Sequence, residues 1–272
     1  AEAIASALRV CDEFLISDGY STDGTYEVVK QISNLNNKVR IFRSKWPNTK
    51  SITILADVTN EVRKKCKYDY IFYVQANEIV HEESVRFIKA LPEMRPDVNT
   101  FSFPYLQLMQ NYKYTEEFRL RFSRNLPEIV ATGDAWTLGV SRSGIDAKEF
   151  ACLKNPKKFF FYLGHGIDYV FANPCTSPLT RAIYLPKPMF RYWSLFPRNH
   201  VEKCIKHKEM FNLQEFTKTI NILKNRIDED PQTFWKDAVK LARDGLYVSN
   251  PVFNYPEDLE RITINEHPKI IQ

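Results

Sequence analysis

The sequence predicts an α/β protein with a mostly parallel sheet flanked by helices and a helical extension toward the C-terminus. Short runs rich in aromatic and β-branched residues, at 14–16, 39–42 and 70–74, alternate with segments whose apolar residues recur at helical spacing. Strands separated by helices of this length form β-α-β units, whose crossovers are right-handed. From residue 199 onward the spacing is mainly helical.

The elements of the first part of the chain follow from these two periodicities. In chain order we expect helix 1–8, strand 14–16, helix 25–32, strand 39–42, helix 52–65, strand 70–74, helix 81–90 and strand 100–103. Ser21 and Thr22 offer N-caps for the second helix. Pro47 and Asn48 end the second strand.

Later segments divide the chain into two parts. Alternating apolar and basic residues over 118–124 have the period of a strand with one basic face. Residues 150–190 fit neither periodicity, and we expect an insertion or lid there. Three helices are expected in the last part, at 201–211, 214–227 and 233–243. We therefore expect one domain over 1–190 and a helical extension over 191–272.

Composition excludes several classes of protein. With 272 residues, 44% of them apolar, the chain can bury a full core, which excludes a disordered protein. The net charge of +5 is spread along the chain, so we expect no nucleic acid partner. The five cysteines form no Cys-x-x-Cys pair, and no apolar run approaches the ~20 residues that span a bilayer. We expect a cytoplasmic protein with reduced thiols and at most peripheral membrane contact.

The first candidate site is the turn Asp18-Gly19-Tyr20-Ser21-Thr22-Asp23-Gly24-Thr25, between a predicted strand and a predicted helix. Ligands of parallel sheets collect beyond the carboxyl ends of the strands. The Asp18 carboxylate can accept hydrogen bonds from a ribose or a base edge, and glycine lets the backbone approach a ligand closely. A capped turn without a ligand would use the same residue types.

The whole string resembles the nucleotide-binding segment of family 2 glycosyltransferases, which have the GT-A fold. The resemblance implies that Asp18 contacts the uracil or ribose of a nucleoside-diphosphate sugar, with Gly19, Ser21 and Asp23 in the same binding segment. It also implies that residues 1–4 continue the helix that follows the family's first strand. We therefore expect a strand before Ala1.

The second candidate site is Gln75-Ala76-Asn77-Glu78, at the end of the strand predicted over 70–74. The resemblance places here the family's Asp-x-Asp motif, whose carboxylates bind a divalent cation that bridges to the diphosphate. Gln75 and Asn77 are neutral amides, and only Glu78 keeps a charge. Three interpretations stay open: a weakened Mn²⁺ or Mg²⁺ site using Asn77 and Glu78, metal-independent binding in which basic residues neutralise the diphosphate, and an inactive site.

The third candidate is Asp134, in Gly133-Asp134-Ala135-Trp136. Inverting sugar transfer needs a carboxylate that takes the proton of the acceptor, and the resemblance puts Asp134 near that position. A turn capped by Asp134 is the alternative. Arg121, on the basic face of the strand over 118–124, could bind the diphosphate, although such a face can equally be solvated.

These residues predict a glycosyltransferase that moves a sugar from a nucleoside diphosphate to an unknown acceptor by inverting direct displacement. The acceptor would be a glycan, a lipid-linked sugar or a protein. One alternative is a catalytically degenerate protein that binds sugar nucleotides or glycans without transfer. A second alternative is a basic nucleic-acid-binding module that uses Arg119, Arg121 and the Lys-rich helices.

Overall fold

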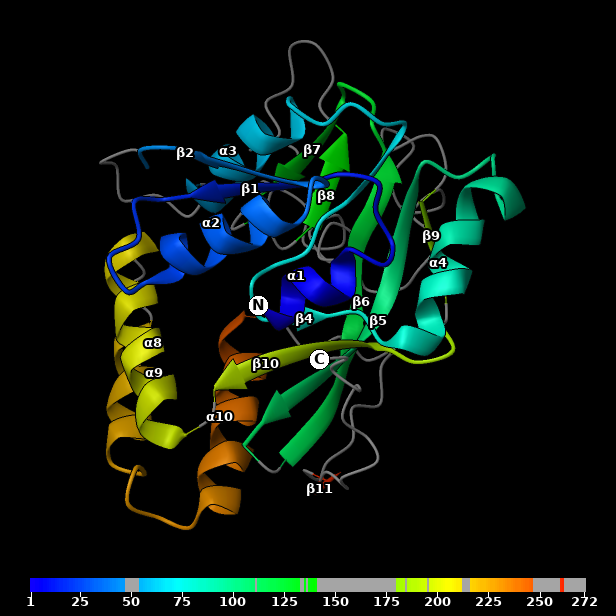
Figure 1. Ribbon diagram of the computed structural model, residues 1–272. Coiled ribbons are helices and arrows are strands. Elements are labelled where there is room, and N and C mark those ends of the chain that lie inside the picture. The colour runs from blue at the N-terminus through cyan, green and yellow to red at the C-terminus, as the bar shows by residue number, and fades with distance from the viewer. Residues whose placement is uncertain are drawn as a thin grey trace.

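The protein is a mixed α/β structure with helices around a curled mixed sheet (Figure 1). The computed structural model describes residues 1–46, 54–110, 112–132, 135, 137–140, 180–183, 185–194, 196–211, 216–246 and 260–261. Most of the insertion or lid expected over 150–190 lies outside these residues, as does most of the chain after 246. Among the described residues, no helix combines the length and the apolar character needed to cross a membrane.

The N-terminal unit has the expected β-α-β order. Helix α1 (Glu2–Ala7) precedes strand β1 (Phe14–Asp18), helix α2 (Thr25–Leu35) and strand β2 (Val39–Arg43). The two strands are parallel and form their own two-stranded sheet, from Phe14 opposite Val39 to Asp18 opposite Arg43. Ile4, Val29 and Val39 are the buried core of this unit, which joins α1 and α2 to the strands.

The main sheet is mixed, so the prediction of a mostly parallel sheet is wrong. Strands β5 (Thr100–Met109) and β6 (Tyr112–Arg124) pair antiparallel over nearly their whole length. Two residues separate these strands, and so short a connection joins antiparallel strands only. Strand β3 (Tyr70–Phe72), expected to continue the parallel series, instead pairs antiparallel with β6.

Shorter strands complete the sheet around this hairpin. On the other edge of β5, strands β9 (Thr180–Ala182) and β10 (Met189–Ser194) pair with it in parallel. Strand β4 (Glu78–Ile79) pairs antiparallel with β10, and β11 (Glu260–Arg261) pairs antiparallel with β6. A separate antiparallel hairpin is formed by β7 (Ile129–Thr132) and β8 (Thr137–Val140).

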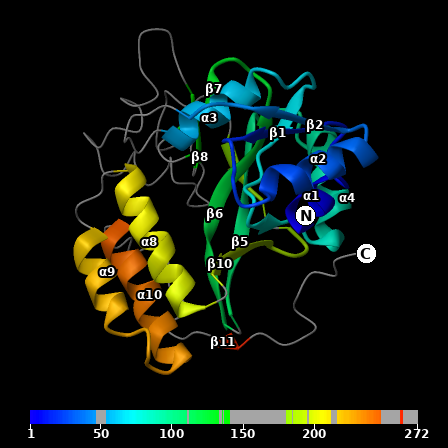
Figure 2. The ribbon, with the colours of Figure 1, turned by 60° about the vertical axis from the view of Figure 1, so that its left-hand side comes forward.

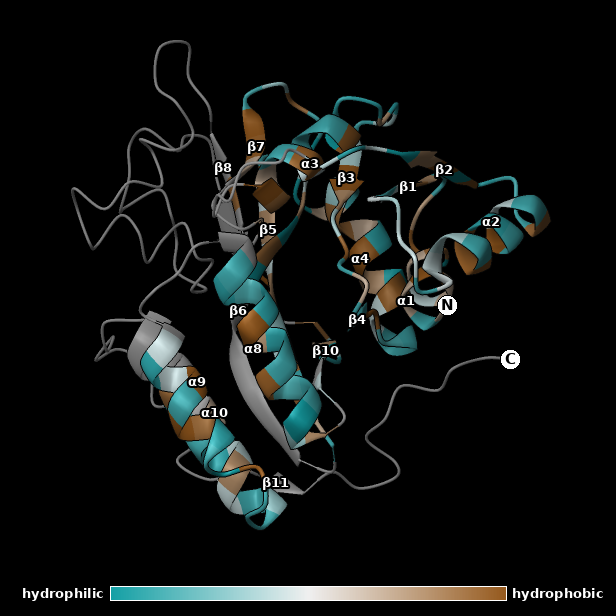
Figure 3. Ribbon diagram, turned by 90° about the vertical axis from the view of Figure 1, so that its left-hand side faces the viewer, coloured by the Kyte–Doolittle hydropathy of each residue, from teal (hydrophilic) through white to brown (hydrophobic). Residues whose placement is uncertain are grey.

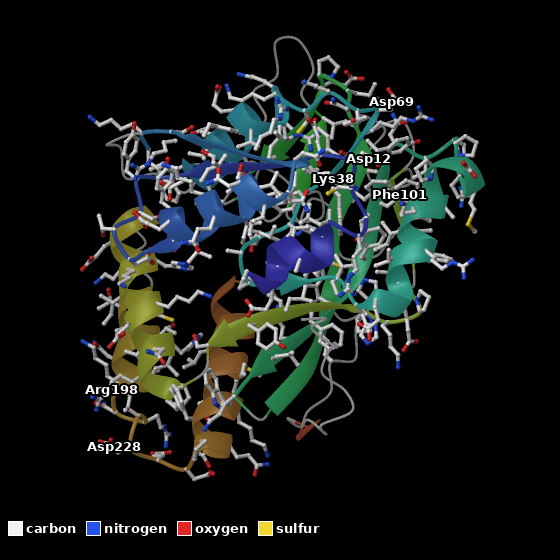
Figure 4. All side chains as sticks on the ribbon, viewed as in Figure 1. Asp12, Lys38, Asp69, Phe101, Arg198 and Asp228 are labelled. Atoms are coloured by element: carbon white, nitrogen blue, oxygen red, sulfur yellow. The ribbon has the colours of Figure 1, made fainter. Side chains whose placement is uncertain are left out.

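The largest buried core lies between the sheet and helix α4 (Glu82–Met94). Phe101, Phe103 and Phe122 from the β5–β6 hairpin pack there with Ile88 and Leu91 of α4. Figure 4 shows Phe101 beside α4. Helix α3 (Ile54–Arg63) covers another part of the sheet, where its Ala56 packs with residues of β6, β7 and β8.

The helical extension is present as three helices that pack together. They are α8 (Pro197–Phe211), α9 (Phe216–Lys224) and α10 (Pro231–Leu246). Their apolar faces meet around Phe234 and Trp235, which pack against Met109 of β5. The helices therefore stand beside β10 and the β5–β6 hairpin (Figure 2). Figure 4 labels Arg198 and Asp228 toward the outer end of this group of helices.

Candidate functional site

Asp18 is the last residue of β1, and its buried carboxylate holds the turn that follows. Its Oδ2 accepts hydrogen bonds from Tyr20 N at 2.9 Å and Arg43 Nε at 3.0 Å, and Ser21 N lies 3.3 Å from both oxygens. Burial favours the neutral carboxyl group, but hydrogen bonds from Ser21, Arg43 and Tyr20 outweigh it and lower the pKa of Asp18. Asp18 is therefore ionised at neutral pH and fixes the turn.

Aromatic rings surround this turn. The Arg43 guanidinium lies 4.3 Å from the ring centre of Tyr20 and 4.2 Å from that of Tyr26. Trp46 covers Gly19 so closely that a Cβ on Gly19 would lie 2.6 Å from the indole nitrogen. Only glycine at position 19 leaves room for the indole in this position.

The rest of the turn leads directly into α2. The N-cap is Gly24, and not Ser21 or Thr22 as expected, because the helix begins at Thr25. Gly24 has φ of 86°, a left-handed conformation that suits glycine, and Asp23 Oδ1 accepts a hydrogen bond from Thr25 N at 3.1 Å. The structure thus brings the predicted sugar-nucleotide residues of this segment into one turn: Asp18, Gly19, Ser21 and Asp23.

Glu78 and Arg121, predicted for different roles, are bound to each other inside the protein. Arg121 Nη2 lies 2.9 Å from Glu78 Oε1 and its Nε lies 3.2 Å from Oε2, which also accepts from Tyr105 Oη at 3.1 Å. Both charged side chains are 1% exposed or less. Burial opposes ionisation of Glu78, but Arg121 outweighs it and lowers the pKa of Glu78.

This pair also organises the Gln75–Glu78 segment. Gln75 N donates to Glu78 Oε2 at 3.1 Å, which closes the segment into a turn before β4. Asn77 Nδ2 donates to Tyr192 O at 2.7 Å, and Tyr192 N donates to Asn77 O at 2.9 Å. The amide of Asn77 is therefore held against β10, while its side-chain oxygen keeps acceptor capacity.

Three basic residues lie where α8 packs against β10. Arg191 is opposite Glu78 in the pairing of β10 with β4, and its charge contributes to the lowered pKa of Glu78. Burial, with the charge of Arg191, lowers the pKa of Lys203 to about 8. Burial, with the charges of Lys203 and Arg191, lowers the pKa of His207 to about 4. The charges that help to lower the pKa values of Lys203 and His207 are those of neighbouring cations.

None of these three residues was among the site residues predicted from sequence. The available signal was the spacing of Lys203 and His207, four residues apart on a predicted helix and so on one face. The place of Arg191 next to Glu78 follows from the pairing of β10 with β4, which residue spacing does not show. His200 on the same helix lies 5.3 Å from the ring centre of Trp235, and burial lowers its pKa to about 3.

The predicted catalytic base, Asp134, lies outside the described residues. The strands before and after it, β7 and β8, form the antiparallel hairpin. Ala135 next to it is buried and has φ of 64°.

Figure 3 places β4 and β10 between the N-terminal unit and α8. The Asp18 turn, at the end of β1, belongs to the N-terminal unit, and the basic residues of α8 belong to the opposite side of this arrangement. A scan against protein-family models and a search of curated proteins gave no match for this chain.

Proposed function

We propose that this protein is a glycosyltransferase of the family 2 type that uses a nucleoside-diphosphate sugar. The observation that carries the proposal is the turn after β1. It joins the carboxyl end of a parallel strand to the N-terminus of α2, its backbone is fixed by a buried ionised carboxylate, and its sequence is the Asp-Gly-x-Ser-Thr-Asp-Gly-Thr string. Open parallel units bind nucleotides at this position.

In this proposal the N-terminal unit is the nucleotide-binding edge of a GT-A-like fold. Asp18 Oδ1 accepts a hydrogen bond from Ser21 N at 3.3 Å. This oxygen keeps capacity to accept from a ribose hydroxyl or a base edge. The ring of Tyr20, 53% exposed, offers a flat surface for a base at the same turn.

The chemical step assigned to Asp134 is proton removal from the acceptor. The acceptor oxygen forms a bond to C1 of the sugar, the bond from C1 to the diphosphate oxygen breaks, and the acceptor proton passes to the Asp134 carboxylate. The nucleoside diphosphate leaves with its electron pair. A single displacement of this kind inverts the configuration at C1.

The test is nucleoside diphosphate release from a panel of uridine, guanosine, thymidine and adenosine diphosphate sugars, with mixed glycan acceptors. We expect release from at least one sugar donor, and at least a hundredfold slower release by Asp134→Asn, because general base catalysis contributes about 10²–10⁴-fold. Nucleotide binding by Asp134→Asn should match the wild type. Equal rates in the two proteins would remove Asp134 from the mechanism.

A protein that binds sugar nucleotides without transfer is the second candidate. The engagement of Glu78 by Arg121 favours it, since the one charged residue of the altered motif is held in a structural pair. Nucleotide binding with no release from any sugar donor would support this candidate over the enzyme. The nucleic-acid alternative loses its two arginines, because Arg119 and Arg121 are 3% and 1% exposed, and keeps only the Lys-rich helices.

A further inference from the structure

Trp46 follows the end of β2 and lies over the turn that follows β1. The two strands are parallel, so their carboxyl ends meet at one edge, and Ser44 N donates to Asp18 O at 3.0 Å just beyond the last strand pair. The chain then brings the indole of Trp46 over Gly19. Its atoms nearest the place of a Cβ on Gly19 are Nε1, Cε2 and Cδ1, at 2.6, 2.9 and 3.1 Å. The N–H edge of the five-membered ring therefore faces the glycine.

The indole N–H of Trp46 has no acceptor in this position. Nε1 is buried, and none of the residues that the structure describes accepts a hydrogen bond from it. A tryptophan N–H usually finds a partner when it is buried, and a buried donor without a partner costs free energy. The position over Gly19 is therefore unfavourable for the polar edge of the ring. An oxygen offered by a ligand would remove this cost.

The turn beneath the ring, in contrast, is fixed by its own contacts. Tyr20 has φ of 63°, a left-handed conformation that is costly for a bulky side chain. It is held there by the hydrogen bond from its N–H to Asp18 and by its ring, which lies against the Arg43 guanidinium. The turn is therefore preset, and Trp46 is the residue beside it that gains by moving.

The space over Gly19 is also the place where a nucleotide would approach. Ligands of open parallel units lie beyond the carboxyl ends of the strands, and glycine allows a ligand to come close to the backbone. The indole fills the space that the missing Cβ leaves. A nucleotide and the ring cannot both occupy it, so nucleotide binding at this turn requires the ring to move.

The second candidate segment contributes little to holding the ligand through a metal. Hard divalent cations take about six or more oxygen ligands, typically with carboxylates among them. Both oxygens of Glu78 accept hydrogen bonds from Arg121, and the side chain is fully enclosed. Within the described part of the chain, no group of three or more His, Cys, Asp or Glu residues could hold a metal ion. More of the affinity for a nucleotide therefore falls to the turn after β1.

We propose that Trp46 is a nucleotide-binding residue, whose indole leaves Gly19 when the nucleotide binds and donates its N–H to an oxygen of the ligand. The inference rests on the proposed function where it identifies this ligand as the nucleotide of a sugar donor. Nucleoside diphosphates carry acceptor oxygens on the diphosphate and the ribose, and most bases carry a carbonyl group. The exchange gives a partner to a donor that has none over Gly19, so Trp46 contributes to affinity.

The test follows tryptophan fluorescence while the full chain is titrated with uridine, guanosine, thymidine and adenosine diphosphates. The chain has four tryptophans, so Trp46→Phe, which keeps a ring but has no N–H, isolates the signal of Trp46. The matched control is Trp235→Phe, the same exchange in the core among the C-terminal helices. We expect an emission change in the wild type and Trp235→Phe that is mostly lost in Trp46→Phe, with about tenfold weaker binding by Trp46→Phe alone. Thermal melts of both variants check that they fold.

Three results would overturn the inference: an emission change that persists in Trp46→Phe, wild-type affinity in Trp46→Phe, and tighter binding by Trp46→Ala, which would mean that the ring only obstructs the site. The proposed function fails separately. Nucleotide binding with the Trp46 signal but no release from any sugar donor contradicts the enzyme and leaves Trp46 as a binding residue. Release without the Trp46 signal contradicts the inference and leaves the enzyme. If the wild type binds none of the four nucleotides, both fail.

Discussion

Two arginine–carboxylate pairs, Asp18 with Arg43 and Glu78 with Arg121, have the same construction in different surroundings. In each, the guanidinium lies near two tyrosine rings: Arg43 near those of Tyr20 and Tyr26, and Arg121 near those of Tyr73 and Tyr105. Arg43 is 33% exposed, whereas Arg121 and Glu78 are 1% and 0% exposed. In the first pair only Arg43 reaches the surface, since the Asp18 side chain is 2% exposed, whereas the second pair is enclosed on both sides.

This difference separates a pair that a ligand can rearrange from one that it cannot. Arg43 reaches water, and the buried Asp18 carboxylate also accepts hydrogen bonds from Tyr20 N and Ser21 N, so a ligand group could replace Arg43 without leaving Asp18 unpaired. Removing a partner from Glu78–Arg121 leaves an uncompensated buried charge. The outer pair therefore suits binding, and the inner pair holds β4 against β6.

The largest expected effect is that of Glu78→Gln. The variant keeps the shape of the side chain but leaves the Arg121 charge without its carboxylate, which destabilises proteins by about 3–5 kcal/mol. Urea unfolding followed by circular dichroism measures the loss. A loss below ~1 kcal/mol would show that the pair is not structural.

The double variant Glu78→Gln with Arg121→Met is the control for this prediction. It removes both charges, so we expect it to be more stable than Glu78→Gln alone. If the stability loss of the double variant equals the sum of the losses of Glu78→Gln and Arg121→Met, the two side chains act independently.

A smaller effect is expected for Gly19→Ala, in the outer region. The added methyl group meets the Trp46 indole, and overpacking of this kind costs about 1–3 kcal/mol. Because the ring can shift, the cost should fall at the low end, with weaker nucleotide binding as the larger consequence. Intrinsic tryptophan fluorescence and urea unfolding follow both effects. Unchanged nucleotide affinity would remove Gly19 from the site.

The smallest effect is a difference in acid sensitivity. Asp18 and Glu78 have lowered pKa values in the folded protein, while carboxyl groups of an unfolded chain titrate near ~4. The unfolded chain therefore binds more protons in acid. The stability that each pair contributes is present above the pKa of the unfolded chain and is lost as the pH falls through the folded pKa. The double variant at Glu78 and Arg121 should lose less stability between pH 5 and pH 3 than the wild type. An equal loss would assign the acid sensitivity elsewhere.

Sequence periodicity predicted the local elements of the fold well. The α1–β2 unit, α4 and the three C-terminal helices lie close to their expected positions, because apolar spacing and capping residues act within a few residues. Sheet direction was not predictable in the same way. The β5–β6 hairpin sets the antiparallel pairing. In the sequence, only the first four residues of β5 were recognised as a strand.

In the candidate site, too, contacts between chain neighbours were predictable and contacts between distant residues were not. The Asp18 turn is formed by residues next to one another in the chain, so its sequence indicated it. Glu78 and Arg121 are far apart in the chain; the family resemblance suggested a metal ligand at Glu78, and residue type suggested a phosphate ligand at Arg121. Arg191 reaches Glu78 only through the pairing of β10 with β4. Contacts made by sheet pairing leave no periodic signal.

The central claim, that the Asp18 turn binds the nucleoside of a sugar donor, is tested most directly by thermal-shift measurements. Wild-type protein, Asp18→Asn and Asp23→Asn would be compared with a panel of nucleoside diphosphates, since a ligand that binds only the folded state raises the apparent Tm. We predict that at least one nucleotide stabilises the wild type and Asp23→Asn but stabilises Asp18→Asn far less. No stabilisation of the wild type by any nucleotide, or equal stabilisation of Asp18→Asn, would contradict the claim.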